Sequence, residues 1–338
     1  MRDTILYDSA MRLFADHMSP RLLAAAGEGV WPADLWGAVE AAGYLDVLAD
    51  GSEGMVEAAT ILRAAGHHAA PIPLVETILA RWLCHACGVV PPAGALTIAP
   101  VEPDDRILLV GETLGGRAGF VPWGRDAEAV VLIAEGRLYI APRSRAGYEL
   151  GANLAGEPRD ALQAVGEDVA SVPLADAIDA ELLLRLGALL RAAQMAGAMQ
   201  ASLDLTVQYA NDRVQFGRPI GKFQAIQQQM ALLAEEAAAA LVAVENAAIA
   251  VAEARPSAGL AVPAAKIRAG EAAGRVAEIA HQVHGAIGFT EEHSLHYLTR
   301  RLWSWRDEFG HEGYWASALG REIAAAGADG LWPLITAS

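Results

Sequence analysis

The spacing of apolar residues predicts a long helical bundle in the second half of the chain. Between residues 223 and 251, apolar residues recur at steps of three and four, which indicates one helix with a continuous apolar seam. Similar helices are predicted over residues 180–212 and 261–285, with a shorter one near the end of the chain. Together they indicate a four-helix bundle. The seam consists of Phe223, Ile226, Met230, Leu233, Ala237, Ala240, Val244, Ala247 and Val251.

Two segments with different sequence patterns precede the bundle. The first has the pattern of short amphipathic helices, with Pro32 at a helix start and Gly43 and Gly66 at helix ends. In the second, short β-branched and aliphatic runs alternate with Gly, Pro, Asp and Arg, which is typical of strands. We therefore predict a multidomain α+β fold with a helical amino-terminal domain (1–90), a small middle β domain (91–178) and a carboxy-terminal bundle (179–338).

Composition and charge exclude some classes of function. The 338 residues are 54% hydrophobic and 20% charged, a globular composition with room for two or three domains. The formal net charge of −16 argues against nucleic acid as a partner, because a phosphate backbone is bound by clustered Lys and Arg. We see no stretch of about 20 residues apolar enough to span a bilayer, and no apolar signal-peptide core at the start. We expect a cytoplasmic protein without a membrane span.

The two cysteines form a C-x-x-C pair, Cys84 and Cys87, with His85 between them. A zinc site needs about four ligands, and no second cysteine pair is present to complete one. A redox pair normally opens a helix in a βαβ unit, whereas this pair ends an apolar run that has a helical pattern. We therefore expect no metal site.

A polar turn separates the first two long helices of the bundle. In the sequence NDRVQFGRPIGKFQAIQQQMA, Gly217, Pro219 and Gly221 interrupt the helical pattern. An arginine, two amides and the free backbone amides of a helix start can bind a diphosphate, but the same donors also serve in a simple capped turn. Both interpretations stay open from the residues by themselves. The turn presents Arg213, Gln215, Phe216, Phe223 and Gln224 together at one end of the bundle.

A second motif, HQVHGAIGFTEE, ends the third long helix at His284. Gly285 and Gly288 follow, and glycine can both stop a helix and let a ligand approach the backbone. Together the two motifs resemble the bundle of the flavin-dependent acyl-CoA dehydrogenase family, with its pattern R-x-x-F-G-x-x-I-x-x-F-Q and then Q-x-x-G-G-x-G-x. The order of the three domains resembles that of the family over nearly the whole chain, but the specific sequence motifs lie in the bundle.

This resemblance implies a cofactor and its contacts. It implies that FAD lies between the β domain and the bundle of one subunit, while its diphosphate and adenosine reach the bundle of a neighbouring subunit. Ala286 stands where the family has a second glycine, which makes the approach tighter. By position in the two motifs, the contacts of this chain with FAD would be Arg213, Gln215, Phe216, Phe223, Gln224, Gln282, His284, Gly285 and Ala286.

The resemblance also implies a reaction, in which a carboxylate removes the proton α to an acyl-CoA thioester and hydride passes to the flavin. The family takes this base from a Glu after the second motif, and counting from Arg300 places Phe309 there. Other relatives take it from the first bundle helix, where this chain has Gly187. The β domain also lacks the family's T-E-P-x-x-G-S-D loop and its W-I-T-N strand, which contact the flavin ring. We therefore expect no catalytic residue in this chain.

Glu308 is the fallback candidate for the base, and Asp307 is a weaker candidate than Glu308. Helical spacing places Phe309 in a buried apolar stripe and Glu308 beside Arg301 and Ser304, on a charged face where an acid usually forms a solvated ion pair. The stripe consists of Leu295, Leu298, Leu302, Trp305 and Phe309.

The chain keeps the motifs that would contact the FAD diphosphate but lacks the family's catalytic carboxylate, and this combination suggests a hypothesis about partners. The chain would be the non-catalytic half of an α2β2 acyl-CoA dehydrogenase that completes the FAD sites of a catalytic partner chain. The substrate would be an acyl-CoA, with the steroid side-chain thioesters of some bacterial relatives as one candidate, and the acceptor would be an electron-transferring flavoprotein or similar. Two alternatives stay open: a self-sufficient homo-oligomer that uses Glu308, and a purely structural partner without FAD contact.

Overall fold

The amino-terminal part of the computed structural model is a group of short helices. The structure describes residues 4–49, 53–110, 113–166, 169–327 and 329–336. Ser19 caps the second helix by accepting a hydrogen bond from the amide of Leu22 at 3.1 Å, and Pro20 occupies the first turn, where its missing N–H is not needed. The elements are α1 (Thr4–His17), α2 (Pro20–Gly27), α3 (Ala33–Ala41), η1 (Val47–Ala49), α4 (Gly54–His67) and α5 (Leu74–Ala86).

Two glycines predicted to end helices have different roles. Gly43 follows α3 with a φ of +74° and ends it as predicted. The prediction for Gly66 is wrong, because this residue lies inside α4 where that helix crosses α6 (Ala180–Asp212). A Cβ at Gly66 would overlap the backbone of Gln194, and a Cβ at Gly197 would overlap the carbonyl oxygen of Arg63. Gly66 and Gly197 thus let the backbones of α4 and α6 come into direct contact, with no space for a side chain between them.

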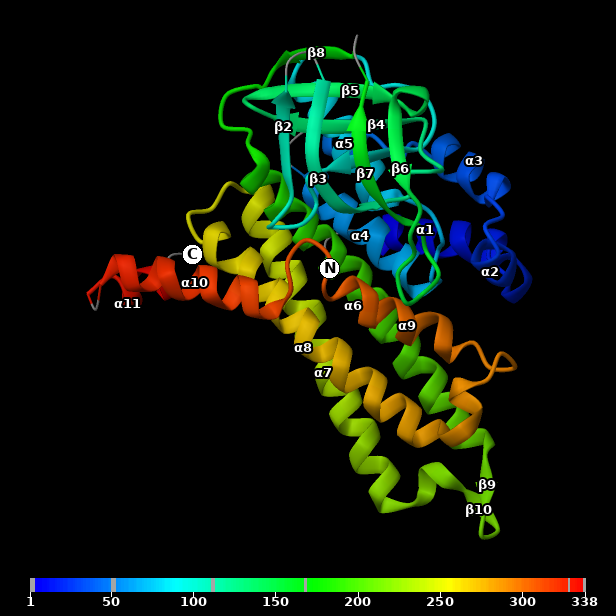
Figure 1. Cartoon of the computed structure of the whole chain (residues 1–338). Helices are drawn as coiled ribbons and strands as arrows, with labels where there is room; N and C mark the ends of the chain where they lie inside the picture. Colours follow the sequence, from blue (N-terminus) through cyan, green and yellow to red (C-terminus); the bar gives the residue numbers. More distant parts are fainter. Residues whose placement is uncertain (1–3, 50–52, 111–112, 167–168, 328, 337–338) are drawn as a thin grey trace.

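The middle part of the chain forms two four-stranded sheets (Figure 1). Neighbouring strands are antiparallel, apart from β1 and β4, which are parallel with Leu96 opposite Ala129. A 3-10 turn, η2 (Arg143–Arg145), joins β5 to β6. One sheet has the order β1 (Leu96–Ala99), β4 (Ala129–Ala134), β5 (Arg137–Pro142), β8 (Ala170–Pro173), and the other β2 (Arg106–Val110), β3 (Thr113–Pro122), β7 (Arg159–Val165), β6 (Ala146–Glu149).

Strand β4 is buried along its whole length because both of its faces are covered. Val131 and Ile133 pack into the main core that the helices share, whereas Val130 and Leu132 pack into a smaller core between the two sheets. Successive side chains of a strand point to opposite faces, so the unbroken apolar run AVVLIA suits a strand between two layers. The β domain is joined to the helices through this strand.

The rest of the chain is helical, and the predicted fold class is confirmed. Figure 1 shows α6, α7 and α8 side by side, reaching away from the sheets to a small hairpin, with α10 and α11 projecting from the body. The elements after α6 are β9 (Val214–Gln215), β10 (Arg218–Pro219), η3 (Ile220–Lys222), α7 (Gln224–Ala252), α8 (Ala258–His284), η4 (Gly285–Phe289), α9 (Leu295–Trp305), α10 (Glu312–Ala326) and α11 (Leu331–Thr336).

Helix α6 is the central element of the bundle. Asp179 caps it by accepting a hydrogen bond from the amide of Leu182 at 2.7 Å. Contrary to the sequence-based expectation, α6 is long and apolar enough to cross a membrane by length and composition. In the structure 89% of its apolar window is buried inside the protein, as expected for a core helix that is apolar all round.

Candidate functional site

The turn between α6 and α7 is a short β-hairpin at the far end of the bundle (Figure 1). The amide of Arg213 donates to the carbonyl of Tyr209 at 2.9 Å, which ends α6. Phe216 and Gly217 form the tip with φ of +52° and +78°. Positive φ at both central residues matches the twist of a two-residue hairpin, and glycine adopts it without strain. Phe216 holds this uncommon conformation while 92% exposed.

The side chains assigned to FAD in the first motif lie together around this hairpin. Arg213, Gln215 and Gln224 are exposed, and Phe223 is half-buried. The ring of Phe216 stands edge-on to that of Phe223, with 6.2 Å between the centroids. The structure therefore brings the first motif together on one surface.

The start of α7 lies on the same surface and is suited to an anion. Phe223 precedes the helix and provides no side-chain cap, and the first turn contains no acid. The first amides of α7 and the positive end of its dipole therefore lack a capping side chain in the described structure, close in sequence to Arg213 and Lys222. Such a helix start binds phosphate groups.

The second motif lies at the same end of the bundle. Helix α8 ends at His284 as predicted, and Gly285 turns the chain with a φ of +66°. Gln282, Gly285 and Ala286 are exposed, and space is open where a Cβ on Gly285 would stand. A ligand can therefore approach the backbone there.

The side chain of His284 does not reach this surface. It is buried, its Nδ1–H donates to the carbonyl of Ala280 at 2.8 Å, and its ring stacks on Tyr209 with 4.5 Å between the centroids. Burial lowers the pKa of His284 to about 4, so the ring is neutral. The stack joins the end of α8 to α6 one turn before Arg213, and His284 positions the second motif beside the first.

The two positions where the resemblance places a base are in contact, and neither is a carboxylate. Helix α9 ends at Trp305, four residues earlier than the helical spacing predicts, and Phe309 has a φ of +55° in the turn that follows. Phe309 is fully buried, as predicted, but not as part of a helix. A Cβ on Gly187 would overlap the ring of Phe309, so the phenyl group fills the space beside Gly187.

The prediction that Glu308 lies on a solvated charged face is wrong. Because α9 ends early, the chain turns Glu308 inward, and only 8% of the residue is exposed. Its Oε1 accepts a hydrogen bond from Nε of Arg159 at 2.7 Å, and its Oε2 lies 2.9 Å from a guanidinium nitrogen of Arg191. Both oxygens are engaged by guanidinium groups, which is the geometry of a buried structural ion pair.

Glu308 belongs to a buried charge cluster that joins all three parts of the fold. Arg191 also pairs with Glu76 of α5, and Glu157 accepts hydrogen bonds from Arg301 at 3.0 Å and from Arg159 at 3.2 Å. Burial by itself would raise the pKa of Glu157, but Arg301 and Arg159 outweigh it and lower that pKa to about 2. The cluster consists of Glu76, Glu157, Glu308, Arg159, Arg191 and Arg301.

Sequence reasoning missed most of this cluster. A signal was present, because Glu76 and Arg191 are single charges within apolar helical runs, and such residues are buried only when they are paired. Their partners come from other domains, so the sequence could indicate that these two charges are buried and paired, but not which residues they pair with.

A cavity of about 570 Å³ lies between the β domain and α9, where the resemblance places a flavin ring. Phe120 and Trp303 line it together with carboxylates that include Glu102, Asp307 and Glu308. Burial raises the pKa of Glu102 to about 8, helped by the negative charge of Glu308. Removing a proton from a thioester and reducing a flavin both develop negative charge, which the negative charge of Glu308 opposes. This cavity is poorly suited to that chemistry.

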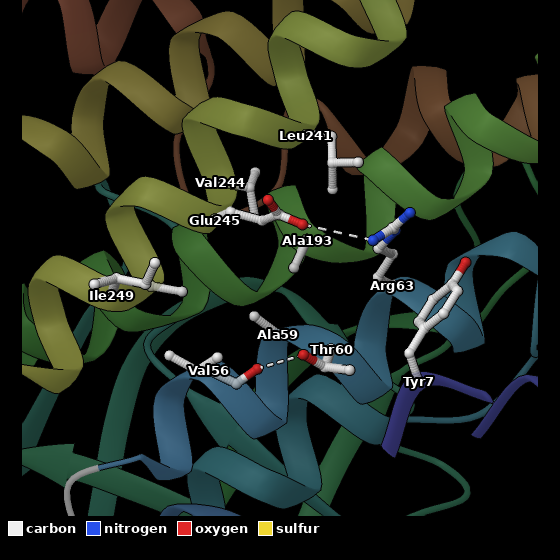
Figure 2. Close-up of a pocket in the computed structure, with 11 residues that line it drawn as sticks. Tyr7, Val56, Ala59, Thr60, Arg63, Ala193, Leu241, Val244, Glu245 and Ile249 are labelled. Carbon is white, nitrogen blue, oxygen red and sulfur yellow. Dashed lines mark hydrogen bonds and ion pairs between the residues drawn. The ribbon is translucent and has the colours of Figure 1, made fainter. Parts of the chain in front are cut away.

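A second cavity lies between α1, α4, α6 and α7 (Figure 2). Val56, Ala59 and Ile249 form part of its lining, and Arg63 faces Glu245 across it at 3.6 Å. Its volume is about 80 Å³. An apolar cavity of about 150 Å³ holds a molecule of about the size of benzene. This space is therefore too small for a long acyl chain or a steroid.

A group of amino-terminal helices, a two-sheet β domain and a long helical bundle define the class of acyl-CoA dehydrogenase-like proteins, and the comparisons agree. The model of the family "Acyl-CoA dehydrogenase, C-terminal domain" matches residues 179–312. The acyl-CoA dehydrogenase IpdE2 of Mycolicibacterium smegmatis is 30% identical over 88% of this chain and 91% of its own length. The acyl-CoA dehydrogenase FadE27 of Mycobacterium tuberculosis is 30% identical over 78% of this chain and 80% of its own.

The chain belongs to the acyl-CoA dehydrogenase family, whose members are FAD-dependent oxidoreductases that act on CH–CH groups. Solved structures share the fold. The Tcur3481-Tcur3483 steroid ACAD G363A variant has a TM-score of 0.84 and 24% identity, covering 96% of this chain and 98% of that one. The ChsE4-ChsE5 complex from Mycobacterium tuberculosis has a TM-score of 0.80 and 23% identity, covering 94% and 96%. When bound, FAD supplies the acceptor for hydride.

Proposed function

We propose that this chain is the non-catalytic subunit of a heteromeric FAD-dependent acyl-CoA dehydrogenase. Its bundle end would hold the diphosphate and adenosine of an FAD whose flavin ring lies in a catalytic partner chain. Arg213, the start of α7 and the open backbone at Gly285 fit that half of the cofactor.

One observation carries the proposal: Phe309 fills the space beside Gly187 while Glu308 is held by Arg159 and Arg191. A base for α-proton removal must be a carboxylate free to approach the substrate. Both positions that would supply it are apolar here, and the neighbouring acid is locked in ion pairs. The chain therefore depends on a partner for catalysis.

The relatives support a substrate class and an assembly. Two solved structures with this fold are described as a steroid ACAD and as a complex of two differently named chains. We infer an acyl-CoA thioester substrate, with a steroid side-chain CoA as the first to test, and an α2β2 assembly. An electron-transferring flavoprotein or a similar acceptor would reoxidise the flavin.

Flavin counting on the assembled complex tests the proposal. The chain is co-expressed with its catalytic partner, the complex is purified, and FAD per chain is measured by absorbance for Arg213→Ala. Losing a charge-assisted contact with a diphosphate should weaken FAD binding by roughly tenfold or more. Arg275→Ala on α8, where the arginine pairs with exposed Glu278 at 2.7 Å, is the matched control and should keep its FAD.

The alternatives predict other outcomes. Unchanged flavin content in the Arg213→Ala complex would support a purely structural partner. If the chain purified alone carried a full complement of FAD and dehydrogenated acyl-CoAs, it would be a self-sufficient enzyme and the proposal would be wrong.

A further inference from the structure

The cavity of about 570 Å³ between the β domain and α9 has the size of a small-molecule pocket, and the function proposed above does not use it. An aromatic ring lines it from each side, Phe120 from β3 and Trp303 from α9. Phe120 is 56% exposed, so its ring is open to the cavity instead of packing in a core. Exposed apolar surface inside a cavity of this size is typical of a ligand site.

Acids outnumber bases in the lining of this cavity. Five carboxyl groups stand against one guanidinium group, so the formal charge of the lining is −4. The guanidinium belongs to Arg159, which is already paired with Glu308 at 2.7 Å. Asp104 and Asp307 are exposed, from the β domain and from the turn after α9, and neither forms an ion pair with a described residue. The five acids are Glu102, Asp104, Asp105, Asp307 and Glu308.

The acids of the β domain are held in place by their own turn. Oδ2 of Asp105 accepts hydrogen bonds from the amides of Val101 and Glu102, each at 3.0 Å. Its Oδ1 accepts one from the amide of Gly119 at 2.9 Å. Burial raises the pKa of Glu102 to about 8, so this carboxyl group is neutral at pH 7, and the charge of the lining becomes −3. A bound cation favours the ionised form of such an acid.

The nearest free base of the chain does not neutralise this lining. Lys266 lies close enough to lower the pKa of Glu102, but it is not part of the cavity wall. Its Nζ donates instead to the carbonyls of Arg306 and Gly310 at 2.6 and 2.7 Å. The negative charge of the cavity is therefore open to a cation from outside the chain.

We propose that this cavity binds a linear polyamine, with its ammonium groups at the carboxylates of the two walls and its methylene segments against Phe120 and Trp303. A polyamine with three positive charges matches the charge of the lining. Aromatic faces attract cations and cover methylene groups, and carboxylates accept charge-assisted hydrogen bonds from ammonium groups. A compact metal ion would gain nothing from the two rings. The site contains no residue assigned to FAD, so it is independent of the proposed function.

Calorimetry of the full-length chain with spermidine tests the site at about 0.15 M salt, which screens diffuse attraction to an acidic surface. Phe120→Leu keeps an apolar side chain but removes the ring, so spermidine should bind about three- to tenfold more weakly. Phe120→Tyr keeps a ring and should restore the affinity. Asp307→Asn should weaken binding about two- to fivefold. The matched control is Glu40→Gln, an exposed acid on α3, which should leave the affinity unchanged.

Several results would overturn the polyamine site. Absence of spermidine binding, or equal affinity in Phe120→Leu and the unaltered chain, would leave only diffuse attraction to the acidic surface. Ca²⁺ that displaces spermidine and binds more tightly would make the cavity a metal site. Displacement of spermidine by FAD would make it a flavin site. The flavin count of the Arg213→Ala complex tests the proposed function separately, because Arg213 lies at the far end of the bundle and does not line this cavity.

Discussion

Replacing Glu308 by Gln should destabilise the whole fold, because it leaves an uncompensated charge in the interior. The buried cluster contains three carboxylates and three guanidinium groups, so its formal charge is zero. Glutamine keeps the shape of the side chain but removes one negative charge beside Arg159 and Arg191. Water cannot compensate, since only 8% of Glu308 is exposed.

The magnitude follows from this burial. Removing one partner of a buried ion pair costs about 3–5 kcal/mol. With an unfolding entropy of about 2.1 cal/mol/K per residue, this corresponds to a fall in Tm of roughly 4–7 °C for a chain of this length. The matched control is Glu278→Gln on α8, whose side chain is 67% exposed in its pair with Arg275. That change should cost less than about 1 kcal/mol.

Thermal and urea unfolding of the single variants and of a double variant provide the assay. Arg191→Gln together with Glu308→Gln restores a formal charge of zero in the cluster. The double variant should therefore be less destabilised than the sum of the two single variants, which is the signature of direct coupling.

Two results would refute this reasoning. Equal unfolding temperatures for Glu308→Gln and Glu278→Gln would mean that the cluster is not a buried network in solution. Loss of acyl-CoA turnover in Glu308→Gln at unchanged stability would instead make Glu308 a catalytic base.

Three further predictions concern packing and pH. Gly197→Ala should destabilise the fold by about 1–3 kcal/mol or more, because its Cβ would overlap the carbonyl of Arg63. Gly320→Ala, in open space on α10, should instead stabilise the fold by about 0.5–1 kcal/mol. Thermal unfolding of the two variants compares these effects. Burial lowers the pKa of Lys266 from 10.5 to about 8, so between those values the unfolded chain binds more protons and stability should rise with pH. Urea titrations should show this rise disappear in Lys266→Met. Burial raises the pKa of Glu102 from 4.5 to about 8, so the folded chain keeps a proton that the unfolded chain has released, and stability should fall with pH in that window. Glu102→Gln should remove the fall, and a flat profile in the unaltered chain would contradict both assignments.

The long helices were predictable because their information is local. The apolar seam from Phe223 to Val251 became α7, with Leu233, Ala237 and Val244 buried, and α8 ends at His284 as its glycine indicates. Helical periodicity and glycine stops depend on residues within a few positions of one another. The hairpin before α7 was likewise visible as a break in the pattern.

The end of α9 was not predictable by the same means. Helical spacing extended the apolar stripe to Phe309, but the chain leaves the helix after Trp305. The buried ammonium of Lys266 on α8 donates to the carbonyls of Arg306 and Gly310 at 2.6 and 2.7 Å, which holds the turn in place. These partners are 40 and 44 residues apart in sequence from Lys266, beyond the reach of any periodicity.

By itself the sequence determined the three-part architecture and the two motifs at one end of the bundle, because these follow from composition and spacing. The resemblance to the family added that Gly187 and Phe309 stand where its members have a catalytic carboxylate. Only the tertiary structure decided where the charges of the interior belong. Glu308 pairs with Arg159, 149 residues earlier, and this pairing turned a surface acid into part of a buried cluster. Desolvation makes a buried charge depend on partners brought close by folding, so its role is settled by packing and not by its neighbours along the chain.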